Sequence, residues 1–152
     1  MDGIIQTFLL AMLPIGELRV SLPISIAVYN LDWKLAFLIS ILGNLVPVLL
    51  LLLFLGPVST FLSNNCVVFK TFFDWLFERT RKKTDSQLLK YGSIALVFFV
   101  AIPLPLTGAW TGAIAAFLFG FSFRKAFPLI SLGVVIAGVI VLILTKLGLW
   151  LI

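Results

Sequence analysis

The segment LPIGELRVSLP, residues 13–23, decides the fold of this chain. It lies within the apolar stretch 4–29, yet it combines Pro14, Gly16 and Pro23 with two charged residues. Proline removes a backbone donor and clashes with the preceding turn, so such a segment interrupts a helix. Backbone groups freed at membrane depth persist only inside protein or beside a water-filled cavity. The stretch therefore predicts a re-entrant hairpin of two short helices, with a kinked spanning helix as the alternative.

A second segment of this kind is IPLPLTGAWTG, residues 102–112. It interrupts the apolar stretch 91–121 with Pro103, Pro105 and Gly108. The same physical reasons apply, so we expect a second hairpin here, again with a kinked helix as the alternative.

Two further apolar stretches, 33–55 and 127–152, have no such break. Each is long enough to cross a bilayer, which takes about 20 residues. A broken segment followed by an intact helix thus occurs twice, and this order indicates a transporter binding site between two halves. Residues 66–79 have aromatic residues on one helical face and predict an amphipathic linking helix in the cytoplasmic headgroup layer. The alternative is a helix packed on the body of the protein.

These features predict an all-α integral membrane protein. It is an inverted repeat of re-entrant hairpin plus transmembrane helix, in one membrane domain. The first repeat is expected at 1–56, the amphipathic helix and a basic loop at 57–90, and the second repeat at 91–152.

The composition excludes several other classes of protein. Of the 152 residues, 62% are hydrophobic and 11% are charged, whereas soluble domains carry about 25% charged residues. Histidine is absent and Cys66 is the only cysteine, so we expect no disulfide, no metal site, no cofactor and no enzyme activity. Although the net charge is +5, its basic cluster at 79–90 is typical of a cytoplasmic loop, and we expect no nucleic-acid partner.

The charge distribution also predicts the topology. A re-entrant hairpin returns to its own side, so each half crosses the membrane once and the second half is inverted. This places Arg124 and Lys125 on the side of the basic segment 79–90, with Asp2, Asp32 and Lys34 opposite. By the positive-inside bias, we expect a multi-pass protein of the cell membrane with both termini outside.

Glu17 and Arg19 are charged residues in the interior of the apolar stretch 4–29. A charge at the bilayer centre costs about 2.5–3.5 kcal/mol even on a mild scale, so such residues are usually functional. Our hypothesis is that Arg19 binds an anionic headgroup while Glu17 takes up and releases a proton. The alternative is that both lock the hairpin to its neighbours.

The second turn offers Thr107, Trp110 and Thr111, which either complete a polar pocket or bind freed backbone carbonyls. The candidate substrate- or ion-binding set is Pro14, Gly16, Glu17, Arg19, Pro103, Pro105, Thr107, Gly108, Trp110 and Thr111. Small residues also recur every four positions, at 108, 112, 116 and 120, and predict close helix packing between hairpins or between subunits.

The motif PIGELRVSLP, together with IPLPLTGAWTG, resembles the small multidrug export protein family over nearly the whole chain. That family is similar to the DedA, or VTT, membrane proteins, and this resemblance implies opposed re-entrant hairpins and transport of lipid-like molecules. Glu17 and Arg19 match the acidic and basic residues of the DedA first hairpin. The arginines of the DedA second hairpin are absent here, and residues 107–111 stand in their place.

We therefore expect ion-coupled secondary transport of an amphiphilic or lipid-like substrate, with Glu17 as the coupling residue. The coupling ion is a proton or sodium, the partners include membrane lipids, and the chain is expected to form a homo-oligomer. One alternative is an uncoupled scramblase or flippase for anionic, polyprenyl-phosphate-like lipids. Another is a non-catalytic membrane scaffold or assembly factor.

Overall fold

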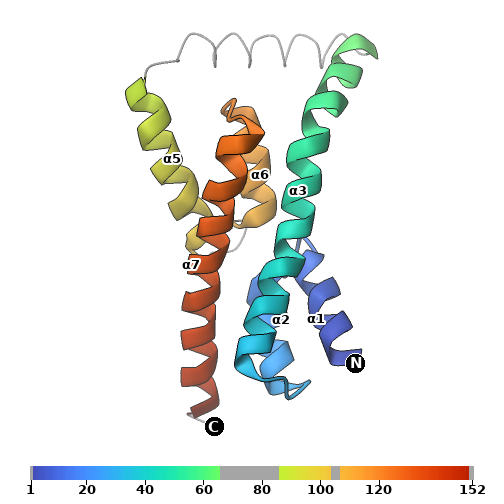
Figure 1. The fold of residues 1–152 in the computed structure, drawn as a ribbon, viewed down its shortest axis with the longest axis vertical. Helices are drawn as coiled ribbons and strands as arrows, with labels where there is room; N and C mark the ends of the chain where they lie inside the picture. Colours follow the sequence, from blue (N-terminus) through green and yellow to red (C-terminus); the bar gives the residue numbers. More distant parts are fainter. Residues whose placement is uncertain (1, 66–85, 104–106, 151–152) are drawn as a thin grey trace.

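The computed structural model describes residues 2–65, 86–103 and 107–150, and these ranges contain helices and no strand. Two short helices and a long helix follow one another twice (Figure 1). The bounds are α1 Asp2–Met12, α2 Glu17–Ala27, α3 Trp33–Asn65, α5 Ser86–Ala101, α6 Ala109–Leu118 and α7 Phe123–Trp150. The all-α prediction is confirmed, while the predicted linking helix at 66–79 lies outside the described residues.

The helix ends follow from local chemistry. The first break falls at residues 13–16 as expected, and α3 begins where the Asp32 carboxylate accepts a bond from the Lys34 amide at 2.9 Å. The helix α6 ends at Leu118, and Gly120 follows it with a φ of +72° that suits glycine. The amide of Phe121 then donates to the carbonyl of Ala116.

One expected break is absent. Pro23 was expected to help interrupt the first apolar stretch, but it lies inside α2. The long helices also contain Pro47, Pro57 and Pro128. In membrane helices, neighbouring groups compensate a lost backbone bond, so a single proline does not end a helix. The break therefore comes from the whole turn at 13–16 and not from Pro23.

The two long helices run in opposite directions through the molecule (Figure 1). The Nζ atom of Lys146, near the end of α7, lies 4.0 Å from the centre of a Trp33 ring at the start of α3. The hairpin α1–α2 enters from this end, whereas α5–α6 enters from the opposite end (Figure 1). Their turns meet inside the molecule, and this junction is the candidate site.

Each long helix approaches the first helix of its own hairpin at a glycine. A Cβ atom on Gly43 would meet the carbonyl of Phe8 and the side chain of Ala11 on α1. A Cβ atom on Gly133 would meet Val100 on α5. Small residues let helix backbones approach closely where lipid supplies no hydrophobic force between helices.

The small-residue series at 108–120 has three different roles. Gly112 lies against Val100 and Ile130, so it packs α6 within its own half, and Ala116 is fully buried. Gly108 lies against Glu17 of the other hairpin, and Gly120 forms the turn that follows α6. The predicted packing between hairpins therefore occurs at one position, Gly108.

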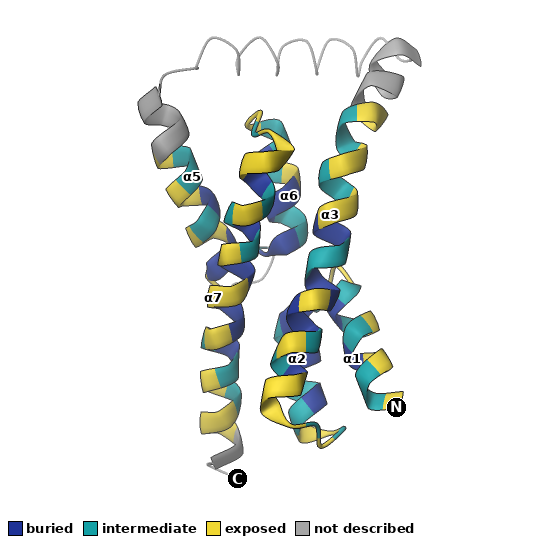
Figure 2. Cartoon of the chain, viewed as in Figure 1, coloured by how far each residue is buried: buried dark blue, intermediate teal, exposed yellow. Residues whose placement is uncertain are grey.

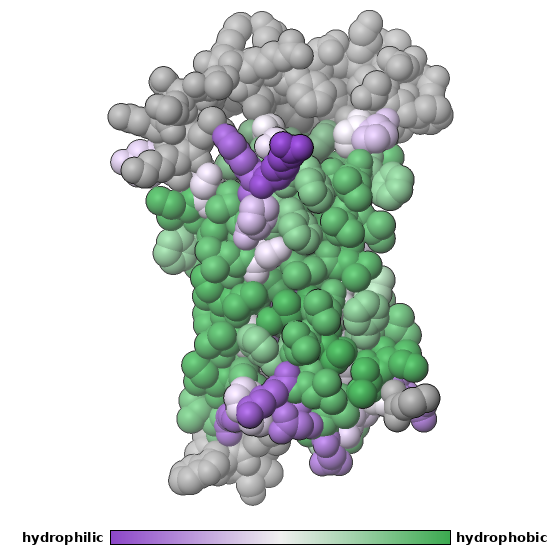
Figure 3. Space-filling model, in the orientation of Figure 1, coloured by the Kyte–Doolittle hydropathy of each residue, from purple (hydrophilic) through white to green (hydrophobic). Residues whose placement is uncertain are grey.

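The surface suits lipid. Polar residues gather at both ends of the face seen in Figure 3, with an apolar band between them. Large apolar side chains are exposed along the long helices, for example Phe54 at 59% and Leu144 at 58%, while the buried residues face inward (Figure 2). Two segments, Trp33–Val58 and Phe123–Gly148, are long and apolar enough to cross a membrane. Apolar surface of this extent is stable only in contact with lipid or protein.

Candidate functional site

The site begins with Glu17, the first residue of α2. Its carboxylate reaches across to the other hairpin, where Oε2 accepts a bond from the Ala109 amide at 3.0 Å. Oε1 accepts a bond from the Trp110 amide at 3.1 Å. These amides open α6 and have no partner within their own helix, and the N-cap residue Gly108 provides no side-chain bond. Glu17 therefore caps α6 from the other half of the chain, where a carboxylate also complements the helix dipole.

The backbone at this junction is adapted to the contact. Glu17 has a φ of +48°, in the left-handed region that costs a non-glycine residue about 1–2 kcal/mol. On the opposite side, a Cβ atom at Gly108 would overlap the Glu17 carboxylate. Strain of this kind persists only where surrounding contacts hold it, and it clusters at functional sites.

Arg19 makes the second connection between the hairpins. Its guanidinium donates to the backbone carbonyl of Thr107 and, at 3.2 Å, to the Thr107 hydroxyl. That hydroxyl in turn donates to the carbonyl of Ile102 at 2.8 Å. Arg19 and Thr107 thus bind backbone carbonyl groups at the turn between α5 and α6.

Trp110 links the junction to α1. Its indole Nε1 donates to the carbonyl of Met12, the last residue of α1, at 3.2 Å. Thr111 donates to the carbonyl of Gly108 within its own helix start, at 3.3 Å. The polar side chains of the second turn therefore bind backbone carbonyls in this structure.

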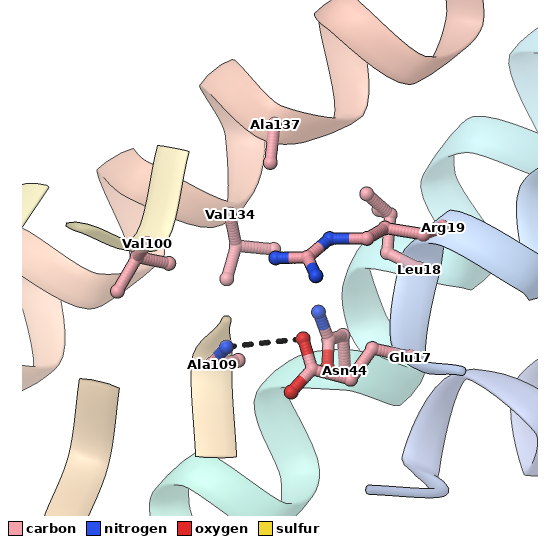
Figure 4. A pocket seen from close by; sticks show the side chains of 8 residues that line it. All are labelled: Glu17, Leu18, Arg19, Asn44, Val100, Ala109, Val134 and Ala137. Carbon is pink, nitrogen blue, oxygen red and sulfur yellow. Dashed lines mark hydrogen bonds between the residues drawn. The ribbon is translucent and has the colours of Figure 1, made fainter. Parts of the chain in front are cut away.

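A small cavity lies beside this junction, with room for about one water molecule. Asn44 of α3 lines this cavity together with Glu17 (Figure 4). Asn44 is 2% exposed, and its Oδ1 has no hydrogen-bond partner in the described part of the chain. The remaining lining residues are Leu18, Arg19, Val100, Ala109, Val134 and Ala137.

A second hollow is apolar and opens at the side of the molecule. It has a volume of about 430 Å³, within the usual range for small-molecule sites. Its lining residues come from α1, α3 and α6 and are Met12, Pro47, Leu50, Leu51, Phe54, Leu55, Val58 and Trp110. Trp110 therefore contacts both the hollow and the carboxylate of Glu17.

The other predicted residues shape the turns. Pro14 is exposed at the tip of the first hairpin, beside Ile15, and Gly16 is the N-cap residue of α2. Pro103 is half-buried in the second turn, and Pro105 lies outside the described residues.

Sequence reasoning missed Asn44, Ser21 and Ser40, which are buried polar residues near the junction. A polar residue within an apolar span is a signal that could have found Asn44. The serines give a weaker signal, because a serine can satisfy its hydroxyl on its own helix.

The arrangement couples a titratable group to the contact between two hairpins. An ionised carboxylate accepts both amide bonds, and charge-assisted bonds are about twice as strong as neutral ones. Protonation removes the charge and turns one oxygen into a donor, so it weakens the cap on α6. A change at Glu17 therefore changes how firmly the two hairpins hold each other.

Comparison with protein families places residues 17–140 in the small multi-drug export protein family. The matched region begins at Glu17, directly after the first turn, and includes the second turn. The family name suggests drug export by its members and specifies no substrate. No curated protein matches the chain, and no solved structure matches it either.

Proposed function

The chain belongs to the small multi-drug export protein family, and from this premise we propose that it is an ion-coupled membrane transporter of amphiphilic or lipid-like molecules. The observation that carries the proposal is the Glu17 carboxylate at the start of α6. A single protonation there alters the contact between two hairpins that enter from opposite ends. Alternating access needs such a link between an ion and the packing of two halves.

Helix lengths support the placement in the membrane. At about 1.5 Å per residue, the 26 residues of Trp33–Val58 extend about 39 Å, more than the hydrocarbon thickness of about 30 Å. The 11 residues of α1 extend only about 16 Å. In this proposal α3 and α7 cross the bilayer, while both hairpins are re-entrant and meet near its middle. The two halves then form an inverted repeat.

The charges at the two ends of the molecule predict its orientation in the membrane. Arg124 and Lys125 begin α7, at the end opposite Lys34 and Lys146. Helix α5 begins at Ser86, at the same end as Arg124 (Figure 1), and the sequence just before it is rich in basic residues. By the positive-inside bias, this end would lie in the cytoplasm. Both termini then lie outside the cell membrane.

The apolar hollow suggests the class of substrate. Its lining is almost wholly apolar, so it suits the hydrophobic body of an amphiphile. Trp110 forms part of its wall and donates its backbone amide to Glu17, so a molecule that moves this residue also disturbs the cap. Because both spans expose apolar side chains, we further propose a homo-oligomer, which size measurement in native lipid nanodiscs would test.

Glu17→Gln tests the coupling, because it removes the titration and keeps the size of the side chain. Everted membrane vesicles would receive an imposed pH gradient, and uptake of a fluorescent amphiphilic cation would be measured. We expect uptake to be lost at normal protein levels. Asp2→Asn is the matched control, since it neutralises an exposed carboxylate at the far end of α1.

Other results would select another function. Unchanged uptake in Glu17→Gln and Arg19→Ala would remove the transporter proposal and favour a scaffold. A second assay follows a fluorescent anionic lipid in liposomes by dithionite bleaching. Lipid flipping without any gradient, unaffected by Glu17→Gln, would indicate an uncoupled scramblase.

A further inference from the structure

Three buried side-chain oxygens have no hydrogen-bond partner within the described residues: Ser21 Oγ, Ser40 Oγ and Asn44 Oδ1. Both serines are completely buried, and Asn44 is 2% exposed. A buried polar group without a partner is rare and calls for a ligand, an ion or an ordered water. The neighbouring Ser25 differs, because its hydroxyl donates to the carbonyl of Leu22 at 2.7 Å.

Asn44 lines the junction cavity, and helix geometry places the two serines about one turn away from it. Asn44 and Glu17 line one cavity from α3 and α2 (Figure 4). The helices α2 and α3 pack together and run in opposite directions (Figure 1). A step of four residues forward from Glu17 on α2 therefore runs the same way as a step of four residues back from Asn44 on α3. This step of about one helical turn brings Ser21 and Ser40 to one level. From there α2 continues to the end of the molecule where Lys34 and Lys146 lie.

We infer that Ser21, Ser40 and Asn44 hold ordered water molecules that carry a proton to Glu17 from the Lys34 end. This inference rests on the proposed role of Glu17 as the coupling residue. A serine hydroxyl both donates and accepts, as a proton relay requires. The proton comes from hydronium in bulk water, and each water in the relay gains one O–H bond and loses another. The last transfer forms an O–H bond on the Glu17 carboxylate.

The charges around the cavity suit this role. Its lining comes from α2, α3, α5, α6 and α7, and Glu17 and Arg19 are its titratable members. At the corresponding positions of the second half stand Ala113, Ile130 and Val134, all fully buried or nearly so. These apolar residues offer water no partner, so the proton has a route to Glu17 from one end of the molecule.

Labelling with dicyclohexylcarbodiimide tests the route, because this lipid-soluble reagent reacts with protonated carboxyl groups in apolar surroundings. The full chain would be studied in right-side-out and everted membrane vesicles, with the pH of each compartment fixed by impermeant buffers. Mass spectrometry would measure labelling at Glu17, and an N-terminal tag would report which compartment faces the start of α1. We expect labelling to follow the pH of that compartment alone.

The double variant Ser40→Val/Asn44→Val would close the route. Labelling of Glu17 in this variant should no longer follow the pH of the compartment that faces the start of α1. Ser25→Ala is the matched control and should behave as the unaltered chain does. Labelling of the unaltered chain that follows the other compartment would overturn the inference, whatever the stability of the variants. Protection of Glu17 by sodium at constant pH would also overturn it, in favour of a cation site.

The test separates two kinds of failure. If labelling follows the expected compartment while Glu17→Gln still transports, the water route stands and the proposed coupling role fails. If Glu17→Gln abolishes transport while labelling ignores Ser40 and Asn44, the coupling role stands and the route fails.

Discussion

The two halves of this molecule share their construction. Each has a short helix, a turn, a second short helix and a long helix, and α3 and α7 bury residues at matching positions. Ala36 and Ala126, each the fourth residue of its long helix, are both fully buried. Gly43 and Gly133 likewise both approach the first helix of their own hairpin. The packing scheme is therefore the same twice.

The polar residues of the two halves differ. Glu17 and Ala109 are the first residues of α2 and α6, and Asn44 and Val134 hold the same place in α3 and α7. The first half thus places a carboxylate, an amide and serines where the second half places apolar residues. What the second half contributes is backbone: the amides of α6 and the carbonyls of its turn. The comparison teaches that the two halves pack alike, while the buried carboxylate at their junction comes from the first half alone.

The shared packing predicts the largest effect. Gly43→Val and Gly133→Val should each destabilise the fold by about 2–3 kcal/mol, because a side chain there overlaps the neighbouring helix. Both should lower the yield of folded protein to a similar extent, measured by size-exclusion chromatography after heating in detergent. Gly148→Ala is the control, since a Cβ atom there meets nothing. Tolerance at one of the two positions would show that the halves do not pack alike.

A second prediction compares the two N-cap glycines. At Gly108 a Cβ atom overlaps the Glu17 carboxylate, so Gly108→Ala should displace it and cost about 2 kcal/mol for the lost charge-assisted bonds. At Gly16 a Cβ atom would instead meet the Cβ atom of the exposed Val20 at 2.9 Å, so this substitution strains the start of α2 without meeting the carboxylate. We expect Gly108→Ala to abolish gradient-driven dye uptake and Gly16→Ala to retain most of it. Equal uptake by both variants would contradict the role of the carboxylate.

Much of the fold could be predicted from the sequence, because its signals are local. The apolar spans and the proline-glycine turns predicted the helices and both breaks, and the family prediction is confirmed. Pro23 was misjudged because the effect of a proline depends on the groups around it, and these come from tertiary packing. The structure describes hairpins that enter from opposite ends, while their depth in a membrane stays a prediction.

The site was less predictable, because its contacts join residues far apart in the chain. Glu17 and Arg19 stood out as charges in apolar sequence, but their partners are backbone groups, which leave no sequence pattern. The burial of Asn44 and Ser21 depends on which helix faces meet. Polar residues in apolar spans can thus be found from sequence, and their pairing needs the structure.

A third prediction exchanges residues between the halves. Val134→Asn would bury an amide among apolar groups of α7 and should cost about 1–3 kcal/mol. Asn44→Val removes a buried oxygen that has no protein partner among the described residues, so its effect on stability should lie near zero. Thermal unfolding in detergent, followed by tryptophan fluorescence, measures both. If Asn44→Val proves as destabilising as Val134→Asn, Asn44 has a structural partner and the asymmetry between the halves is weaker.

A smaller loss of stability than that of Val134→Asn is expected where the halves meet at the Lys34 end. The Lys146 ammonium lies 4.0 Å from the centre of a Trp33 ring, so it joins the end of α7 to the start of α3 by a cation–π contact. Lys146→Gln should lower stability by about 0.5–1 kcal/mol, as for other exposed contacts of this kind. Lys146→Arg should keep the contact and the stability, which separates the loss of charge from the loss of side-chain packing. Since this contact lies at the end of the molecule, dye uptake should stay unchanged in both variants. Reduced uptake in Lys146→Gln alone would mean that the charge at this end affects the route to Glu17. Lys146 of the second half would then contribute to the proton chemistry of the first half.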